Sequence, residues 1–282
     1  MKFDKKVFKK FCFLHIVLLF CGLFLANSSI VAQVLLPEYT NHSSQKSSNS
    51  DEMRRNEQEF AEFLLLLKHK DNAQHEEGLI GKWIVKAEKE HRLEQVYALA
   101  EKYLYHPNSP YRNEEWYLLF LQYADEHQLE VYVKNPRYQK HYAMLRKNRV
   151  GHVATDFAFT TKAGEKGRLY DLSSEYIVLF FHDPNCEECR YVKQRLESNN
   201  AFSIKRDVLV VAVYIDDEVE LWQKAQYPST WLSVYAPEID KKDLYDVRAL
   251  PTLYLLDGQK NVLIKDEPIE KLIIKLQKNS YL

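Results

Sequence analysis

Two cysteines stand three residues apart in the stretch LFFHDPNCEECRYV, Leu179–Val192. The apolar run before them is typical of a buried strand, and the segment after them has helical spacing. A sulfur at the start of a helix lies among unsatisfied N–H groups at the positive end of the helix dipole, which favours a thiolate. We therefore predict that Cys186 is the attacking sulfur and that Cys189, one turn later, closes the disulfide.

Other uses of this pair remain open. A structural zinc ion usually needs four ligands, for which His182 and His152 are the nearest additions. Copper capture by Cys186, Cys189 and His182 is a variant of this interpretation. The pair could also be a purely structural disulfide, although so short a loop stabilises little. We favour redox chemistry at Cys186 and Cys189 and expect no metal and no other cofactor.

Four neighbouring residues are candidate modulators of the pair. His182 could exchange protons near neutral pH, but we favour a polar loop residue at a strand end. Asp183 follows it directly. Glu187 and Glu188 place two carboxylates beside the sulfurs, which disfavours a thiolate. A less stabilised thiolate gives a more stable disulfide, so the sequence predicts a protein on the reducing or isomerase side.

The first residues predict a signal peptide over 1–32. The lysine-rich start MKFDKKVFKK precedes the apolar run FCFLHIVLLFCGLFLA and then small residues. This run is shorter than the roughly 20 apolar residues that cross a membrane. Cleavage is expected after Ser28 or Ala32. A lipid anchor on Cys21 is less favoured, because Phe20 stands where a small residue is expected.

Export changes the meaning of the cysteines. The mature protein is expected to be periplasmic or otherwise exported, with membrane contact only through an uncleaved leader or a lipid anchor. Removal of the leader also removes Cys12 and Cys21. Cys186 and Cys189 then remain as each other's only partner, in a compartment where disulfides persist.

The composition limits the classes of partner. The chain has 282 residues, of which 46% are hydrophobic and 28% charged, as in globular proteins of about two domains. The formal net charge is -1, and acidic and basic residues are interspersed. This pattern gives no electrostatic basis for a nucleic-acid partner.

The middle of the chain predicts a small all-α domain over residues 57–149, after a flexible Ser- and Asn-rich linker over 33–56. Apolar residues recur there at helical spacing, and the aromatic ones among them are expected to form the core. The breaks contain Gly78, residues 106–113 and residues 134–137. The spaced sets are Phe60, Phe63, Leu64 and Leu67; Ile80, Trp83, Ile84 and Ala87; Leu93, Val96, Tyr97, Ala100 and Leu104; Trp116, Leu119, Phe120 and Tyr123; and Tyr138, His141, Tyr142 and Leu145. We expect four or five helices.

Residues 150–282 predict an α/β domain. Short β-rich runs alternate with helical ones, which indicates a mixed sheet with helices on both faces. The expected strands are DFAFT and RLYDL as a hairpin, then YIVLFF, DVLVVAVYI, WLSVYA, PTLYLL and NVLIK. The expected helical segments are CEECRYVKQRLES, EVELWQKA, KKDLYDV and a closing helix with Ile269, Leu272, Ile273 and Leu276.

Several of these features occur together in a known family. From ATDFAFT through ALPTLYLLDGQKNVL, the sequence resembles the exported thioredoxin-like thiol-disulfide oxidoreductases of the TlpA and ResA type. The matching residues are Asp156 and Phe157, the pair Cys186 and Cys189 after a strand, and Pro251. The helical region, with AEKYLYHPNSPYRNEEWY, resembles an uncharacterised domain that precedes thioredoxin-like domains in exported proteins of Gram-negative bacteria.

The resemblance implies a thioredoxin-like fold and a substrate site. Pro251 would be cis and face the cysteines, and the backbone of Leu250 would bind an extended substrate segment. The implied partners are protein thiols and disulfides and a membrane-bound thiol donor. Phe180 stands where the family has a buried acid, so proton transfer would fall to another group or to water. The alternative is a non-enzymatic binding or assembly protein whose helical domain carries the interaction.

Overall fold

The computed structural model describes residues 47–68, 73–199 and 208–278. The predicted signal peptide and the first part of the predicted linker lie outside the described residues. The chain divides into two compact units between Leu79 and Ile80. The boundary that we expect near residue 150 stays a prediction.

The N-terminal region is helical, as predicted, and the apolar stripes of Phe60–Leu67 and Ile80–Ala87 contribute buried side chains. Such helices are stabilised mainly by the packing of one apolar face, so the apolar stripes explain where along the sequence the helices form. The elements are α3 (Ser47–Lys68), α4 (Ala73–Lys89), α5 (Leu93–Ala100), the π-helical turn η1 (Glu101–Tyr105), α6 (Glu114–Glu126), α7 (Glu130–Val133) and α8 (Pro136–Leu145).

Two details of the predicted helices are wrong. Helix α3 begins at Ser47, so the last part of the predicted linker is helical. Its Glu, Met, Arg and Gln residues are good helix formers, and a helix can extend through them without an apolar stripe. Gly78 lies inside α4 rather than at a break. One glycine costs a helix about 1 kcal/mol relative to alanine and does not end it.

The buried face of α6 also differs from the prediction. Of the four residues that we expect in the core, only Phe120 is fully buried. The buried side chains are Tyr117, Leu118, Phe120, Leu121 and Ala124. WYLLFL is a continuous apolar run, so periodicity does not determine which side of the helix faces the core.

The C-terminal region contains a seven-stranded mixed sheet in the order β2-β1-β5-β4-β3-β6-β7. Strand β3 is an interior strand, parallel to β4 and antiparallel to β6. A hairpin of β1 and β2 is present, but its second strand comes earlier than predicted, because only Arg168 of the RLYDL segment lies in β2 and Leu169–Asp171 form a 3-10 turn. The strands are β1 (Ala158–Thr161), β2 (Lys166–Arg168), β3 (Tyr176–Phe181), β4 (Val208–Tyr214), β5 (Leu232–Tyr235), β6 (Thr252–Asp257) and β7 (Val262–Lys265).

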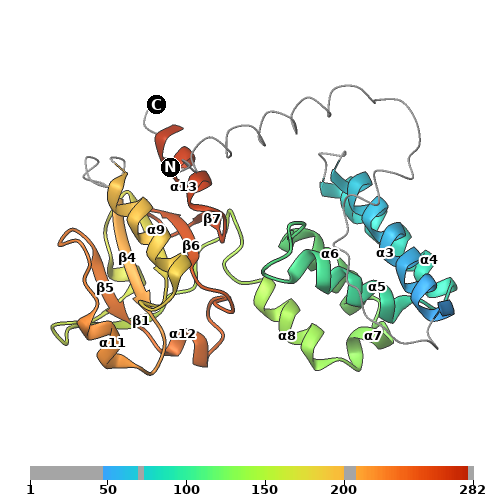
Figure 1. Cartoon of the computed structure of the whole chain (residues 1–282), viewed down its shortest axis with the longest axis horizontal. Helices are drawn as coiled ribbons and strands as arrows, with labels where there is room; N and C mark the ends of the chain where they lie inside the picture. The colour runs from blue at the N-terminus through green and yellow to red at the C-terminus, as the bar shows by residue number, and fades with distance from the viewer. Residues whose placement is uncertain (1–46, 69–72, 200–207, 279–282) are drawn as a thin grey trace, which may run out of the picture. The chain divides into compact units, whose positions relative to one another are not determined.

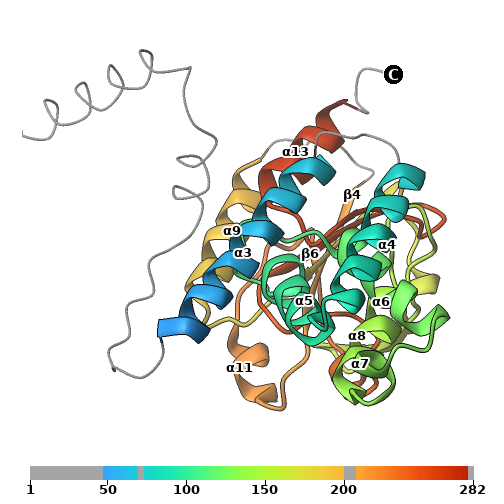
Figure 2. The ribbon, with the colours of Figure 1, turned by 90° about the vertical axis from the view of Figure 1, so that its right-hand side faces the viewer.

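Helices cover both faces of the sheet, which confirms the expected architecture. Helices α9 (Glu187–Ser198) and α13 (Ile269–Lys278) lie side by side on one face (Figure 1), and the view turned by 90° agrees (Figure 2). They pack against Val178 and Phe180 of β3. The opposite face buries Ile177, Leu179 and Phe181 with residues of η2 (Leu169–Asp171) and α12 (Glu238–Lys241). Burial on both faces explains why β3 is apolar throughout.

The remaining helices include one displaced turn. Helix α11 (Val219–Lys224) lies in the predicted EVELWQKA segment. The turn expected in KKDLYDV instead lies mainly before it, in α12. The chain leaves α12 at Asp243, whose φ is 49°, and the N–H of Leu244 bonds to the carbonyl of Ile239 at 2.8 Å. This left-handed cap ends the helix before the segment that we expected to form it. Among the helices that the structure describes, none has both the length and the apolar character needed to cross a membrane.

Candidate active site

Cys186 is the N-cap residue of α9. Its backbone is extended, with φ −77° and ψ 128°, and its Sγ accepts a hydrogen bond from the N–H of Cys189 at 3.1 Å. Two hydrogen bonds to Asp183 fix the turn after β3. Its side chain accepts from the backbone N–H of Asn185 at 2.7 Å, and its carbonyl accepts from the backbone N–H of Cys186 at 3.1 Å. The sulfur of Cys186 therefore lies at the N-terminal, positive end of a helix dipole.

Cys189 lies next to Cys186 but in a different environment. Both are free thiols, and only 2% of Cys189 is exposed whereas Cys186 is half-buried. Burial, and secondly the hydrogen bond with Cys186, raises the pKa of the Cys189 thiol. The two sulfurs are therefore unequal, with an accessible one at the helix end and a protonated one behind it.

The Leu250–Pro251 peptide bond is cis, as expected, and this segment reaches the cysteines. The Sγ of Cys186 donates to the carbonyl of Leu250 at 3.8 Å. Leu250 and Pro251 are both half-buried, so part of their surface faces solvent beside Cys186. The binding of an extended substrate by Leu250 stays a prediction.

His182 is not the polar loop residue that we favoured. His182 is 3% exposed, and its backbone N–H donates to the carbonyl of Val213 at 3.3 Å. Its imidazole ring stacks on Phe180 with centroids 4.6 Å apart. Its Nε2 lies 3.3 Å from the hydroxyl of Tyr227. Burial, and secondly the charge of Lys193, lowers its pKa to about 3. The imidazole is therefore neutral near pH 7 and does not change charge there.

A cavity of about 390 Å³ lies beside Cys189. Phe180 lines it, together with three polar residues that the sequence analysis did not join: His182, Lys193 and Tyr227. Lys193 on α9 forms an ion pair with Glu197 at 3.3 Å. Proton acceptors and donors therefore line the space next to the buried thiol, although no acid replaces Phe180 in the strand itself.

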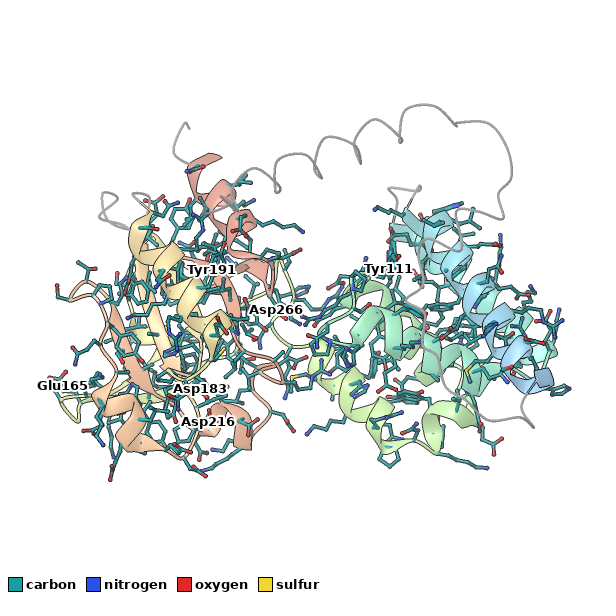
Figure 3. The ribbon with its side chains drawn as sticks, viewed as in Figure 1. Tyr111, Glu165, Asp183, Tyr191, Asp216 and Asp266 are labelled. Carbon is teal, nitrogen blue, oxygen red and sulfur yellow. The ribbon has the colours of Figure 1, made fainter. Side chains whose placement is uncertain are left out.

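Acidic side chains gather at the end of the sheet where β3 and β4 stop. Glu187 and Glu188 are exposed in the first turn of α9, and Asp183 precedes that turn. Asp216, which follows β4, lies at the same end of the sheet as Asp183 (Figure 3). Partial burial, and secondly the charge of Asp183, raises the pKa of Asp216. Asp216 was not among the predicted site residues, but parallel neighbours such as β3 and β4 end at one edge of a sheet, and that rule could have found it.

Over residues 47–68, 73–199 and 208–278, no three His, Cys, Asp or Glu side chains are grouped as metal ligands. The His182 ring instead lies against the hydroxyl of Tyr227, which is not one of the ligands expected for copper, namely Cys186, Cys189 and His182.

Comparison with known proteins finds two family matches along the chain. Residues 40–148 match DUF5106, a domain of unknown function, and residues 166–265 match a thioredoxin-like domain. A thioredoxin-like protein from Bacteroides caccae is 30% identical, with a TM-score of 0.71, and the match covers 79% of this chain and 83% of that one. No curated protein matches.

Two further solved structures each match a little under half of this chain. The C-terminal domain of an uncharacterised protein from Bacteroides fragilis is 37% identical, with a TM-score of 0.45, over 46% of this chain and 98% of that one. The thioredoxin domain of a thiol-disulfide oxidoreductase from Bacteroides vulgatus is 24% identical, with a TM-score of 0.42, over 46% and 97%.

Proposed function

The chain belongs to the thioredoxin-like proteins, with a DUF5106 domain before the thioredoxin-like domain, and from this premise we propose that it is a thiol-disulfide oxidoreductase acting on protein disulfides. The observation that carries the proposal is the inequality of the two sulfurs. Cys186 is accessible at a helix N-terminus, and Cys189 is buried directly behind it. A pair that only stabilised the fold would not need one sulfur partly exposed beside the carbonyl of the half-buried Leu250.

The reaction follows from this arrangement. The thiolate of Cys186 attacks one sulfur of a partner disulfide, so that an S–S bond forms to the partner and the partner's own S–S bond breaks. The released partner sulfur leaves as a thiolate and takes up a proton. Cys189 then loses its proton and attacks the sulfur of Cys186, which releases the second partner thiol. The partner is reduced by two electrons, and the Cys186–Cys189 pair is oxidised to a disulfide.

The acidic surroundings support a role on the reducing side. Asp183, Glu187 and Glu188 disfavour a thiolate on Cys186, and this lowers the reduction potential of the pair. A reductant of this kind needs a source of electrons after each turnover. We place the protein in an exported compartment, following a cleaved leader, with a membrane-bound thiol donor that reduces its disulfide again.

A trapping experiment tests the function. In the Cys189→Ala variant the attack on a partner can begin but the mixed disulfide cannot be resolved, so partners should accumulate on Cys186. The parent should also reduce insulin disulfides in the presence of dithiothreitol. The control is the Cys186→Ala, Cys189→Ala double variant, which should trap nothing. No trapped partner and no insulin reduction by the parent would favour a non-enzymatic scaffold whose helical region carries the interaction.

A further inference from the structure

The segment that ends at the cis peptide bond begins outside the active site. It runs from Asp243 to Pro251 and then enters β6. Two side chains of the helical region hold its first residues. The Nζ of Lys147 donates to the carbonyl of Asp243 at 2.7 Å. The side-chain Nδ2 of Asn148 donates to the carbonyl of Leu244 at 2.8 Å.

Asp246 and Arg248 form a rigid clip near the other end of this segment. The guanidinium donates from Nε to Oδ1 and from Nη2 to Oδ2, both at 2.7 Å. Asp246 is only 8% exposed. Burial raises the pKa of its carboxyl, but the hydrogen bonds and charge of Arg248 outweigh this and hold the pKa below its usual range. A bidentate pair of this kind fixes orientation as well as distance.

Tyr105 of the helical region contacts both members of the clip. The Cζ of Arg248 lies 3.7 Å from the centroid of the Tyr105 ring, and the Tyr105 hydroxyl donates to Oδ2 of Asp246 at 3.5 Å. Tyr105 is the last residue of η1 and is 2% exposed. Short π-helical turns are frequent at functional sites.

The Tyr105 ring is itself held by other helices. It stacks on Tyr117 of α6 with centroids 4.9 Å apart, and its centroid lies 4.3 Å from that of His141 in α8. The hydroxyl of Tyr117 lies 3.0 Å from Nδ1 of His141. The position of Tyr105 is therefore set by η1, α6 and α8 together.

These contacts connect the helical region to the reactive sulfur. Arg248 stands two residues before Leu250, whose carbonyl is the hydrogen-bond partner of Cys186. We propose that Tyr105 and Arg248 are positioning residues, through which the helical region holds the Leu250–Pro251 segment in place to bind the extended disulfide substrate. The proposal rests on the proposed function and gives the helical region a role in it.

The test compares variants of the full chain with a peptide disulfide as substrate. Tyr105→Leu removes the aromatic ring that lies against the Arg248 guanidinium. Arg248→Ala removes the clip, and the Arg248 side chain that is lost is 40% exposed. Each variant should raise KM at least about fivefold, which is the effect expected when a cation–π contact is lost together with the Asp246–Arg248 clip that it supports. Each should leave kcat within about twofold of the parent value. Tyr105→Phe keeps the ring and should restore most of the affinity.

Tyr97→Leu is the matched control. Tyr97 is equally buried, its ring meets Phe120 edge-on and Tyr138 at a tilt, and its hydroxyl donates to the carbonyl of Phe120. Its loss should destabilise the helical region and leave KM unchanged. An unchanged KM in both Tyr105→Leu and Arg248→Ala, or an equal rise in Tyr97→Leu, would overturn the proposal.

Amide hydrogen exchange separates this proposal from the proposed function. In Tyr105→Leu and Arg248→Ala, exchange at Leu250 and Thr252 should accelerate about tenfold or more, and in Tyr97→Leu it should not. If the parent shows no disulfide reductase activity but this pattern appears, the proposed function fails while the positioning contact stands. If exchange at Leu250 and Thr252 stays at the parent rate in both variants, the positioning proposal fails.

Discussion

The Sγ of Cys186 accepts a hydrogen bond from the N–H of Cys189, while the thiol of Cys189 is turned into the protein behind it. One helical turn thus gives the two sulfurs opposite environments. The first lies accessible at the helix end, and burial raises the pKa of the second.

Alkylation should reveal this inequality directly. With iodoacetamide at pH 7.5, about tenfold or more modification should fall on Cys186 relative to Cys189, because the thiolate is the reactive form and only Cys186 is accessible. Peptide mass spectrometry after a time course measures the ratio. The ratio should approach one in denaturant. Equal modification of the folded protein would contradict the structure.

The sequence was most informative where one local pattern determines the result. The apolar run YIVLFF predicts β3 with its observed bounds, because a strand buried on both faces must be apolar throughout. The start of α9 beside Cys186 follows from the change of period after that strand. The cis Leu250–Pro251 bond came from the family resemblance rather than from any local pattern.

The rest depends on residues that are distant in sequence. His182 is buried because Tyr227, 45 residues later, lies against it. Tyr105 and Asp246 are 141 residues apart, and no periodicity connects them. Helix α6 shows a different reason, since its continuous apolar run allows more than one buried face.

Removal of the acidic side chains beside Cys186 should make the pair more oxidising. The Glu187→Gln, Glu188→Gln double variant loses two carboxylates near the thiolate, which stabilises the reduced form. We expect the reduction potential to rise by about 10–30 mV at low salt, because both side chains are exposed and screened. Titration against glutathione buffers measures the shift.

Glu165→Gln is the matched control for this shift. Glu165 is also exposed, but it lies in the turn between β1 and β2 (Figure 3). It should leave the potential unchanged. The shift in the double variant should also shrink as salt is added. A fall in potential, or an equal shift in Glu165→Gln, would rule out the electrostatic explanation.

His182 should make the protein less stable in acid. Its pKa is about 3 in the folded protein and about 6.5 in an unfolded chain, so the unfolded state binds more protons between these values. Stability contributed by the neutral ring is therefore complete above about pH 6.5 and is lost as pH falls, by up to about 1.4 kcal/mol per unit.

Urea unfolding at pH 7 and pH 5 measures the effect. His182→Gln should reduce the loss of unfolding free energy between these pH values, because glutamine does not titrate. The control is His127→Gln, since His127 is exposed on the surface. If the parent and His182→Gln lose the same free energy, the ring is not held neutral.

Arg112 should matter more for stability than the exposed ion pairs do. It pairs with both Glu114 and Asp266, its side chain is 20% exposed, and Asp266 follows β7 (Figure 3). Burial raises the pKa of Asp266 even though Arg112 opposes this. Arg112→Leu leaves Asp266 without this cation in a partly buried site, while Glu114 keeps its ion pair with Lys265, so we expect a loss of about 3 kcal/mol at pH 7.

Acid should relieve part of this loss. In Arg112→Leu, the pKa of Asp266 should rise further, so the folded state takes up a proton before the unfolded state does. The penalty is then largest at neutral pH and shrinks as pH falls through the raised pKa. Arg149→Leu breaks the exposed pair with Glu115 and should cost less than about 1 kcal/mol at any pH. Urea unfolding from pH 7 to pH 4.5 compares the variants, and a penalty for Arg112→Leu that grows in acid would show that Asp266 is not the group left unpaired.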